Sequence, residues 1–150
     1  MESLVSTEWL AGELGAADLV IIDATRHLPA SGRDGAAEYT QRHIPGARFL
    51  DLSALADPAS PVGRTLPGAE QAARVLGALG LSRDKRIVLY DDSAVKTAAR
   101  AWFILTGYGF DEVAILDGGL AKWQAEGRPL ESGTAMLEAS SLSPQEFRHR

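Results

Sequence analysis

The 150-residue sequence predicts an α/β fold with a mostly parallel central sheet and helices on both of its faces. Three short runs rich in Val, Ile and Leu show no apolar–polar alternation, which is typical of strands buried on both faces. Helical patterns separate these runs along the chain. Each run also ends in Asp, and α/β proteins usually place reactive groups where a strand leads into a helix.

Each expected element has a local signal. The expected strands are 19–22, 87–90 and 113–116, with 47–50 as a weaker candidate. A first helix begins at Thr7, with Ser6 as its N-cap. Further helices are expected at 34–41, 67–79, 97–105 and 119–125. Pro67 in the first turn and Gly80 beyond the end favour the 67–79 helix, and 97–105 is apolar nearly all round and therefore expected to be buried.

The chain length predicts one domain, which we place at residues 1–132. No internal repeat occurs. Residues 133–150 are rich in Ser, Ala and Glu and have neither a helix nor a strand period. We therefore expect residues 133–150 to be a linker or tail.

Composition narrows the function classes. A net charge of −5 and the lack of a basic run argue against nucleic-acid binding, and no apolar run reaches the ~20 residues of a membrane span. The N-terminus does not resemble a secretory signal, so a cytoplasmic location is expected. The chain has no cysteine, which removes disulfides, thiolate metal sites and cysteine nucleophiles. Three scattered histidines suggest no metal site, and no cofactor motif occurs.

Tyr90-Asp91-Asp92, at a strand end, allows three hypotheses. An acid before a helix can cap its free backbone N–H groups. Alternatively, an Asp could accept a phosphoryl group with magnesium, which would recruit Asp23, Lys96 and Asp117. The third hypothesis is a degenerate nucleophile loop.

Two further motifs combine turns with polar residues. In HIPGARFLD, His43 adjoins a Pro-Gly turn, where a lone histidine is more often a structural hydrogen-bond donor than a catalyst. Asp117-Gly118-Gly119 joins a strand to a helix, and tight turn geometry is the favoured interpretation of its glycines.

Together, HIPGARFLDL, the YDD strand end and DGGLAKW resemble the rhodanese-like sulfurtransferases over residues 4–129. The motifs RDGAAEY and AARAWF are most similar to the N-terminal half of the tandem-domain thiosulfate and 3-mercaptopyruvate sulfurtransferases. The loop SPVGRTLPG departs from the SPxxHMLP pattern of that half.

The resemblance implies a rhodanese-like fold in which active domains carry a cysteine after the central strand. Matching the strand end puts Asp91 at that position, whereas counting back from Asp117 without gaps puts Asp92 there. We expect one of these carboxylates to plug the anion-binding loop by accepting N–H bonds from residues 93–97, leaving the domain catalytically silent.

The resemblance also implies a partner. In the tandem enzymes the catalytic cysteine lies in a C-terminal rhodanese domain, and a small sulfur donor binds between the halves. The resemblance implies that a histidine and an acid of the first half assist the cysteine loop of the second half. These residues correspond to His43 and, less directly, Asp34. Residues 133–150 would then lead toward an absent second domain. The alternative is a free-standing inactive rhodanese module that binds a protein.

Overall fold

The computed structural model describes residues 2–55, 66–92, 96–134 and 139–148. Its strands are β1 (Leu4–Val5), β2 (Leu19–Asp23), β3 (Arg48–Phe49), β4 (Arg86–Tyr90) and β5 (Val113–Leu116). Its α-helices are α1 (Thr7–Glu13), α2 (Gly35–Gln41), α3 (Ala69–Ala78), α4 (Thr97–Gly107) and α5 (Gly119–Ala125), and 3-10 turns occur at Pro29–Ser31 and Leu52–Leu55. The loop at 93–95 and His149 lie outside the described residues.

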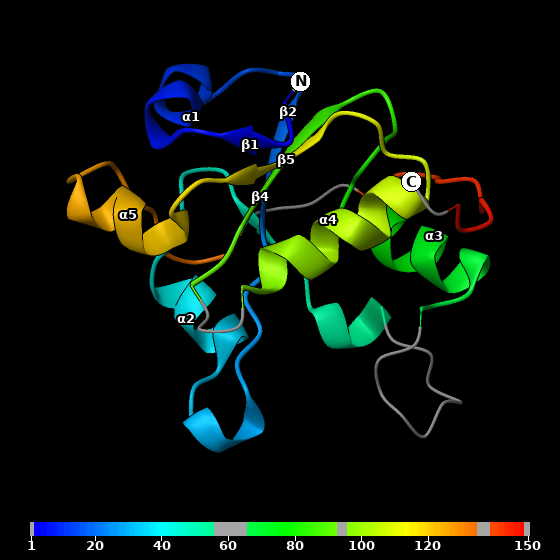
Figure 1. Ribbon diagram of the computed structural model, residues 1–150, viewed down its shortest axis with the longest axis horizontal. Helices are drawn as coiled ribbons and strands as arrows, with labels where there is room; N and C mark the ends of the chain where they lie inside the picture. Colours follow the sequence, from blue (N-terminus) through cyan, green and yellow to red (C-terminus); the bar gives the residue numbers. More distant parts are fainter. Residues whose placement is uncertain (1, 56–65, 93–95, 135–138, 149–150) are drawn as a thin grey trace.

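The strands form a five-stranded sheet in the order β1-β5-β4-β2-β3, and every pairing is parallel. The central pair, β2 and β4, is in register from Leu19–Arg86 to Asp23–Tyr90. Helices cover both faces, with α3 and α4 on one side and α1, α2 and α5 on the other (Figure 1). The predicted α/β class and parallel sheet are confirmed.

Successive residues of the central strands enter two different hydrophobic cores. Ile87 and Leu89 pack toward α3 and α4, whereas Val88 and Tyr90 pack toward α1 and α5. This two-sided burial follows from the period of two in a strand, and it explains why these segments lack polar alternation.

The helix signals are largely confirmed. Ser6 caps α1 by accepting a 3.0 Å hydrogen bond from Trp9 N, and Asp34 is the N-cap of α2 rather than its first residue. The 67–79 pattern becomes a shorter helix, because Gly68 takes an extended conformation and serves as the N-cap of α3. Strand β1 was not predicted: it contributes only two residues at the sheet edge, too few to show a pattern.

Residues after α5 fold back onto the domain. Glu131 forms an isolated antiparallel bridge with His43, with 2.8 Å hydrogen bonds in both directions. Residues 139–148 contain no helix or strand, in line with the absence of a period in their sequence. In the part of the chain that the structure describes, no helix combines the length and apolar character needed to cross a bilayer.

Candidate functional site

Three acids lie together where the two neighbouring strands β2 and β4 end, on the side of the sheet formed by the carboxyl ends of its strands. Asp23 closes β2 and pairs in register with Tyr90, the last residue of β4. Asp91 and Asp92 follow directly. We refer to Asp23, Asp91 and Asp92 as the acidic edge. Asp117, after β5, has an exposed side chain and forms no part of this group.

Asp91 caps helix α4. Its side chain is buried, with only 8% of the residue exposed, and its Oδ2 accepts a 2.7 Å hydrogen bond from Ala98 N. Ala98 is the second residue of α4, and the N-cap residue Lys96 makes no side-chain capping bond. The capping hypothesis therefore describes Asp91, because the carboxylate satisfies a free amide at the positive end of the helix. The expected bonds from the loop amides remain a prediction, since residues 93–95 lie outside the described residues.

The backbone of Asp91 also requires the glycine turn before α5. Asp91 O accepts a 3.1 Å hydrogen bond from Leu120 N. A Cβ on Gly119 would lie 2.5 Å from this carbonyl, and Gly118 and Gly119 both have positive φ, at 84° and 61°. The turn interpretation of Asp117-Gly118-Gly119 is confirmed, because only glycine allows both the conformation and the close approach.

Asp92 has different partners. Its N–H donates to Thr25 Oγ1 at 3.0 Å, and its Oδ2 lies 3.3 Å from Arg33 Nη2 and 3.9 Å from Arg42 Nη2. Arg33 is itself held by Glu38 through two hydrogen bonds of 2.8 and 3.0 Å, and this lowers the pKa of Glu38. The Asp92 carboxylate is thus paired with cations, whereas that of Asp91 is bound by a helix amide.

Asp23 is the most deeply buried acid of the edge. It is 3% exposed, and its Oδ1 accepts hydrogen bonds from Thr25 N at 2.9 Å and Thr25 Oγ1 at 2.5 Å. Burial raises the pKa of Asp23 to about 6, although the Thr25 bonds oppose this. Burial raises the pKa of Tyr90, and the nearby charge of Asp23 adds to this effect. The Tyr90 hydroxyl accepts a 3.3 Å hydrogen bond from Ile44 N. The edge is therefore connected to the HIPGA turn.

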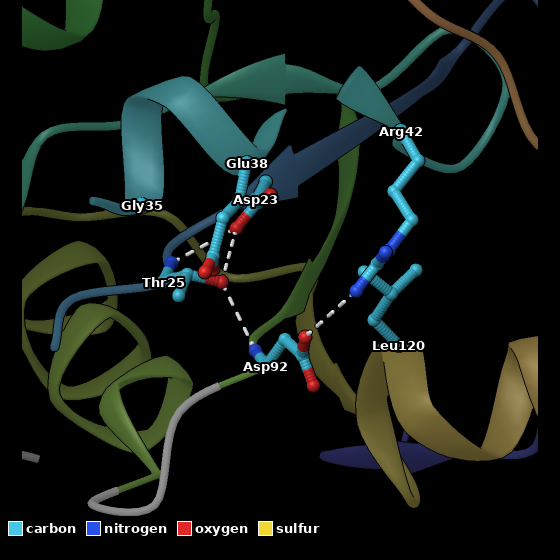
Figure 2. A pocket seen from close by; sticks show the side chains of 7 residues that line it. All are labelled: Asp23, Thr25, Gly35, Glu38, Arg42, Asp92 and Leu120. Carbon is cyan, nitrogen blue, oxygen red and sulfur yellow. Dashed lines mark hydrogen bonds and ion pairs between the residues drawn. The ribbon is translucent and has the colours of Figure 1, made fainter. Parts of the chain in front are cut away.

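These groups surround a pocket between α2, the strand ends and α5 (Figure 2). Its lining residues are Asp23, Thr25, Gly35, Glu38, Arg42, Asp92 and Leu120. Within the described ranges, no group of three or more His, Cys, Asp or Glu side chains could hold a metal ion. The magnesium hypothesis thus gains no support, and Asp117 is exposed rather than gathered at this pocket.

His43 is fixed inside the domain. It is 2% exposed, and its ring stacks on Tyr39 with centroids 4.4 Å apart. Nδ1 lies 2.9 Å from Ile44 O, and Nε2 lies 3.1 Å from Gly133 O. Both ring nitrogens therefore face backbone carbonyls, in an arrangement that braces the turn against the segment after α5.

Asp34 and His43 flank opposite ends of α2. Asp34 Oδ1 accepts bonds from Ala36 N at 3.0 Å and from Ala37 N at 3.3 Å. Asp34 thus starts the short helix α2, whereas His43 lies just beyond its C-cap, Arg42, and holds the segment after α5 through Gly133.

Sequence reasoning missed the basic and hydroxyl partners of the edge, namely Thr25, Arg33 and Arg42. His27, one of the three scattered histidines, also joins these groups, because its Nε2 lies 2.7 Å from Glu38 Oε1. Arg33 is the first residue of the RDGAAEY motif, and Arg42 directly precedes HIPGARFLD. Nothing in their spacing indicates that they meet Asp92, because that contact depends on how the α2 loop packs over β4.

Comparison with known protein families and structures identifies the fold. The family model for the rhodanese-like domain matches residues 6–126. The chain is 40% identical over 152 residues to human 3-mercaptopyruvate sulfurtransferase, covering 97% of this chain and 50% of the human protein. It is also 39% identical to thiosulfate/3-mercaptopyruvate sulfurtransferase 2 of Arabidopsis thaliana, covering 95% of this chain and 42% of that protein.

A solved structure agrees. The crystal structure of a 3-mercaptopyruvate sulfotransferase from Escherichia coli superposes with a TM-score of 0.91 at 37% identity, covering 97% of this chain and 56% of that chain. The chain spans about half the length of the curated relatives it matches. The parallel sheet, the family match across most of the sequence and these relatives establish that the chain belongs to the rhodanese-like domain family.

Proposed function

We propose that this chain is the non-catalytic N-terminal half of a two-domain sulfurtransferase. The whole protein would transfer a sulfur atom from 3-mercaptopyruvate or thiosulfate to an acceptor such as cyanide or a thiol. One observation carries this proposal: the chain matches about half of relatives with those activities in their names, yet it contains no cysteine.

The chemistry of sulfur transfer supports this division of labour. A persulfide intermediate needs a sulfur nucleophile, and a carboxylate cannot replace it. Both acids after β4 also have structural partners, a helix amide for Asp91 and two arginines for Asp92. The second half would supply the cysteine, while this half would supply an interface and one wall of the donor site. A cytoplasmic location remains a prediction.

The contacts favour Asp91 as the residue at the lost cysteine position. In active domains a thiolate is stabilised at the start of the helix that follows the central strand. Asp91 accepts an N–H bond from that helix, α4, whereas the Asp92 carboxylate meets arginines beside α2. A carboxylate at position 91 would therefore keep the helix start satisfied without a thiol.

For His43 and Asp34, the contacts support bracing roles rather than accessory catalysis. The two nitrogens of His43 face the carbonyls of Ile44 and Gly133, and Asp34 caps α2. An accessory role would require His43 to give up one of these contacts.

The test is thiocyanate production from cyanide, with thiosulfate or 3-mercaptopyruvate as the donor. We expect none from the 150 residues alone and activity from the same chain continued into a second rhodanese domain with a cysteine loop. Replacing that cysteine by serine should abolish the activity. Activity of the 150 residues alone would contradict the proposal, and a gene that lacks a second domain would favour the protein-binding alternative.

A further inference from the structure

Residues 139–148, which we call the strap, lie against α3 and α4 without forming a helix or strand (Figure 1, red). Four strap side chains are partly buried, while the rest are exposed. The partly buried residues are Ser140, Leu142, Gln145 and Phe147. One side of the strap therefore faces the domain along its length.

The strap is attached at its start to α3. Ser140 N donates to Gly77 O at 2.8 Å, and Ser140 Oγ donates to Leu81 O at 2.6 Å. A Cβ on Gly77 would lie 2.8 Å from Ser140 O, closer than such atoms normally approach. The absence of a side chain at Gly77 thus makes room for the strap backbone.

The end of the strap is attached to α4. The Phe147 ring lies 5.3 Å, centroid to centroid, from the rings of both Phe103 and Tyr108. Arg148 N donates to Gly107 O at 2.8 Å. A Cβ on Gly107 would overlap the Phe147 ring, so this glycine also makes room for the strap.

Arg83, between α3 and β4, connects the middle of the strap to the end of α4. Its Nε donates to Tyr108 O and its Nη1 to Ser143 O, each at 3.0 Å. The guanidinium also lies over the Phe110 ring, 5.3 Å from its centroid. The strap is therefore held by hydrogen bonds at Ser140, Ser143 and Arg148 and by aromatic packing at Phe147.

We propose that the surface formed by α3 and the end of α4 is a binding surface for the strap, and that the missing side chains of Gly77 and Gly107 make room for it. Glycine within a helix is less favourable than alanine. Two helical glycines therefore need a reason, and each lies where an added methyl group would strike the strap. The folded unit extends to residue 148 and includes the segment that the sequence marks only as a linker.

The strap also has a consequence for the two-domain protein, and this step rests on the proposed function. A docked strap would hold the beginning of the second half beside α4 instead of letting it move on a free tether. The orientation of the two halves would then depend on Phe147 and Arg83.

A double-mutant cycle tests the binding surface in the 150-residue chain. We expect Gly107→Ala to lower the melting temperature by about 5 °C, because the methyl group displaces Phe147. In a Phe147→Ala background the same change should leave the melting temperature unchanged or raise it, as helix propensity alone predicts. Gly12→Ala is the matched control, since Gly12 lies in α1 with open space at its Cβ position, and its effect should be the same in both backgrounds.

Hydrogen exchange gives a second readout that needs no damaging variant. The amides of Ser140 and Arg148 should be protected in the wild type, and the milder Phe147→Leu should speed exchange of Arg148 by about tenfold or more. Unprotected amides in the wild type, or an equal effect of Gly107→Ala in both backgrounds, would overturn the inference. Because these measurements use the chain alone, a failure of the proposed function would leave their outcome unchanged.

Discussion

The acidic edge and the docked strap are stabilised by different kinds of interaction. At the edge, buried or ion-paired carboxylates are held by a helix amide, a hydroxyl and two arginines. At the strap, an irregular segment is held by aromatic packing and by glycines that leave room for it. The stability of the acidic edge should therefore depend on pH and salt, whereas the docking of the strap should depend on side-chain volume.

The largest expected effect is the pH dependence that arises from Asp23. Its pKa is about 6 in the folded state, against roughly 3.9 in an unfolded chain. The stability linked to this raised pKa is fully present below about pH 4 and is lost as the pH rises through about 6. The loss should reach about 3 kcal/mol by pH 7.

Urea unfolding of the wild type and Asp23→Asn across this pH range measures that effect. The variant keeps an oxygen that can accept the Thr25 bonds, but it cannot ionise. As the pH rises, the free energy of unfolding should therefore fall in the wild type but not in the variant. Parallel stability curves would show that Asp23 keeps an ordinary pKa. Strap variants should leave this difference unchanged.

The second effect is the loss of the α4 cap. Asp91→Ala leaves the Ala98 amide without its acceptor and should lower the free energy of unfolding by about 2 kcal/mol. Chemical denaturation measures this change, with Asp92→Ala as the neighbouring control. Equal costs at the two positions would remove the distinction between a capping acid and an ion-paired one.

The smallest effect is expected at Asp92. Its side chain is 22% exposed and meets arginines that are themselves 42% and 45% exposed. Asp92→Asn should therefore cost less than about 1 kcal/mol, and the cost should fade near 1 M salt because solvent and salt screen such pairs. A larger cost that persists at high salt would mean that the pair is more buried than its geometry indicates.

The sequence predicted most of the fold because buried parallel strands and capped helices leave local signals. The run at 113–116 and the helix at 119–125 match the structure, and Ser6 caps α1 as expected. The edge strand β1 could not be predicted, because a strand of two residues shows no periodic pattern.

The site was only half predictable. Asp91 and Asp92 were visible because they follow an apolar run, but their different partners depend on how α2 and α4 approach β4. The packing of the strap could not be predicted for a related reason, because its partly buried positions are unevenly spaced. The role of Phe147 becomes visible only when the fold places its ring against Gly107. Contacts between distant segments carry the information that local patterns lack.

Hydrogen exchange at the Ala98 amide would show whether Asp91 holds the start of α4, the role that we propose it takes in place of a thiolate. We expect a protected amide in the wild type, loss of protection in Asp91→Ala and no change in Asp92→Ala. An unprotected Ala98 amide in the wild type, or equal loss of protection in both variants, would contradict it.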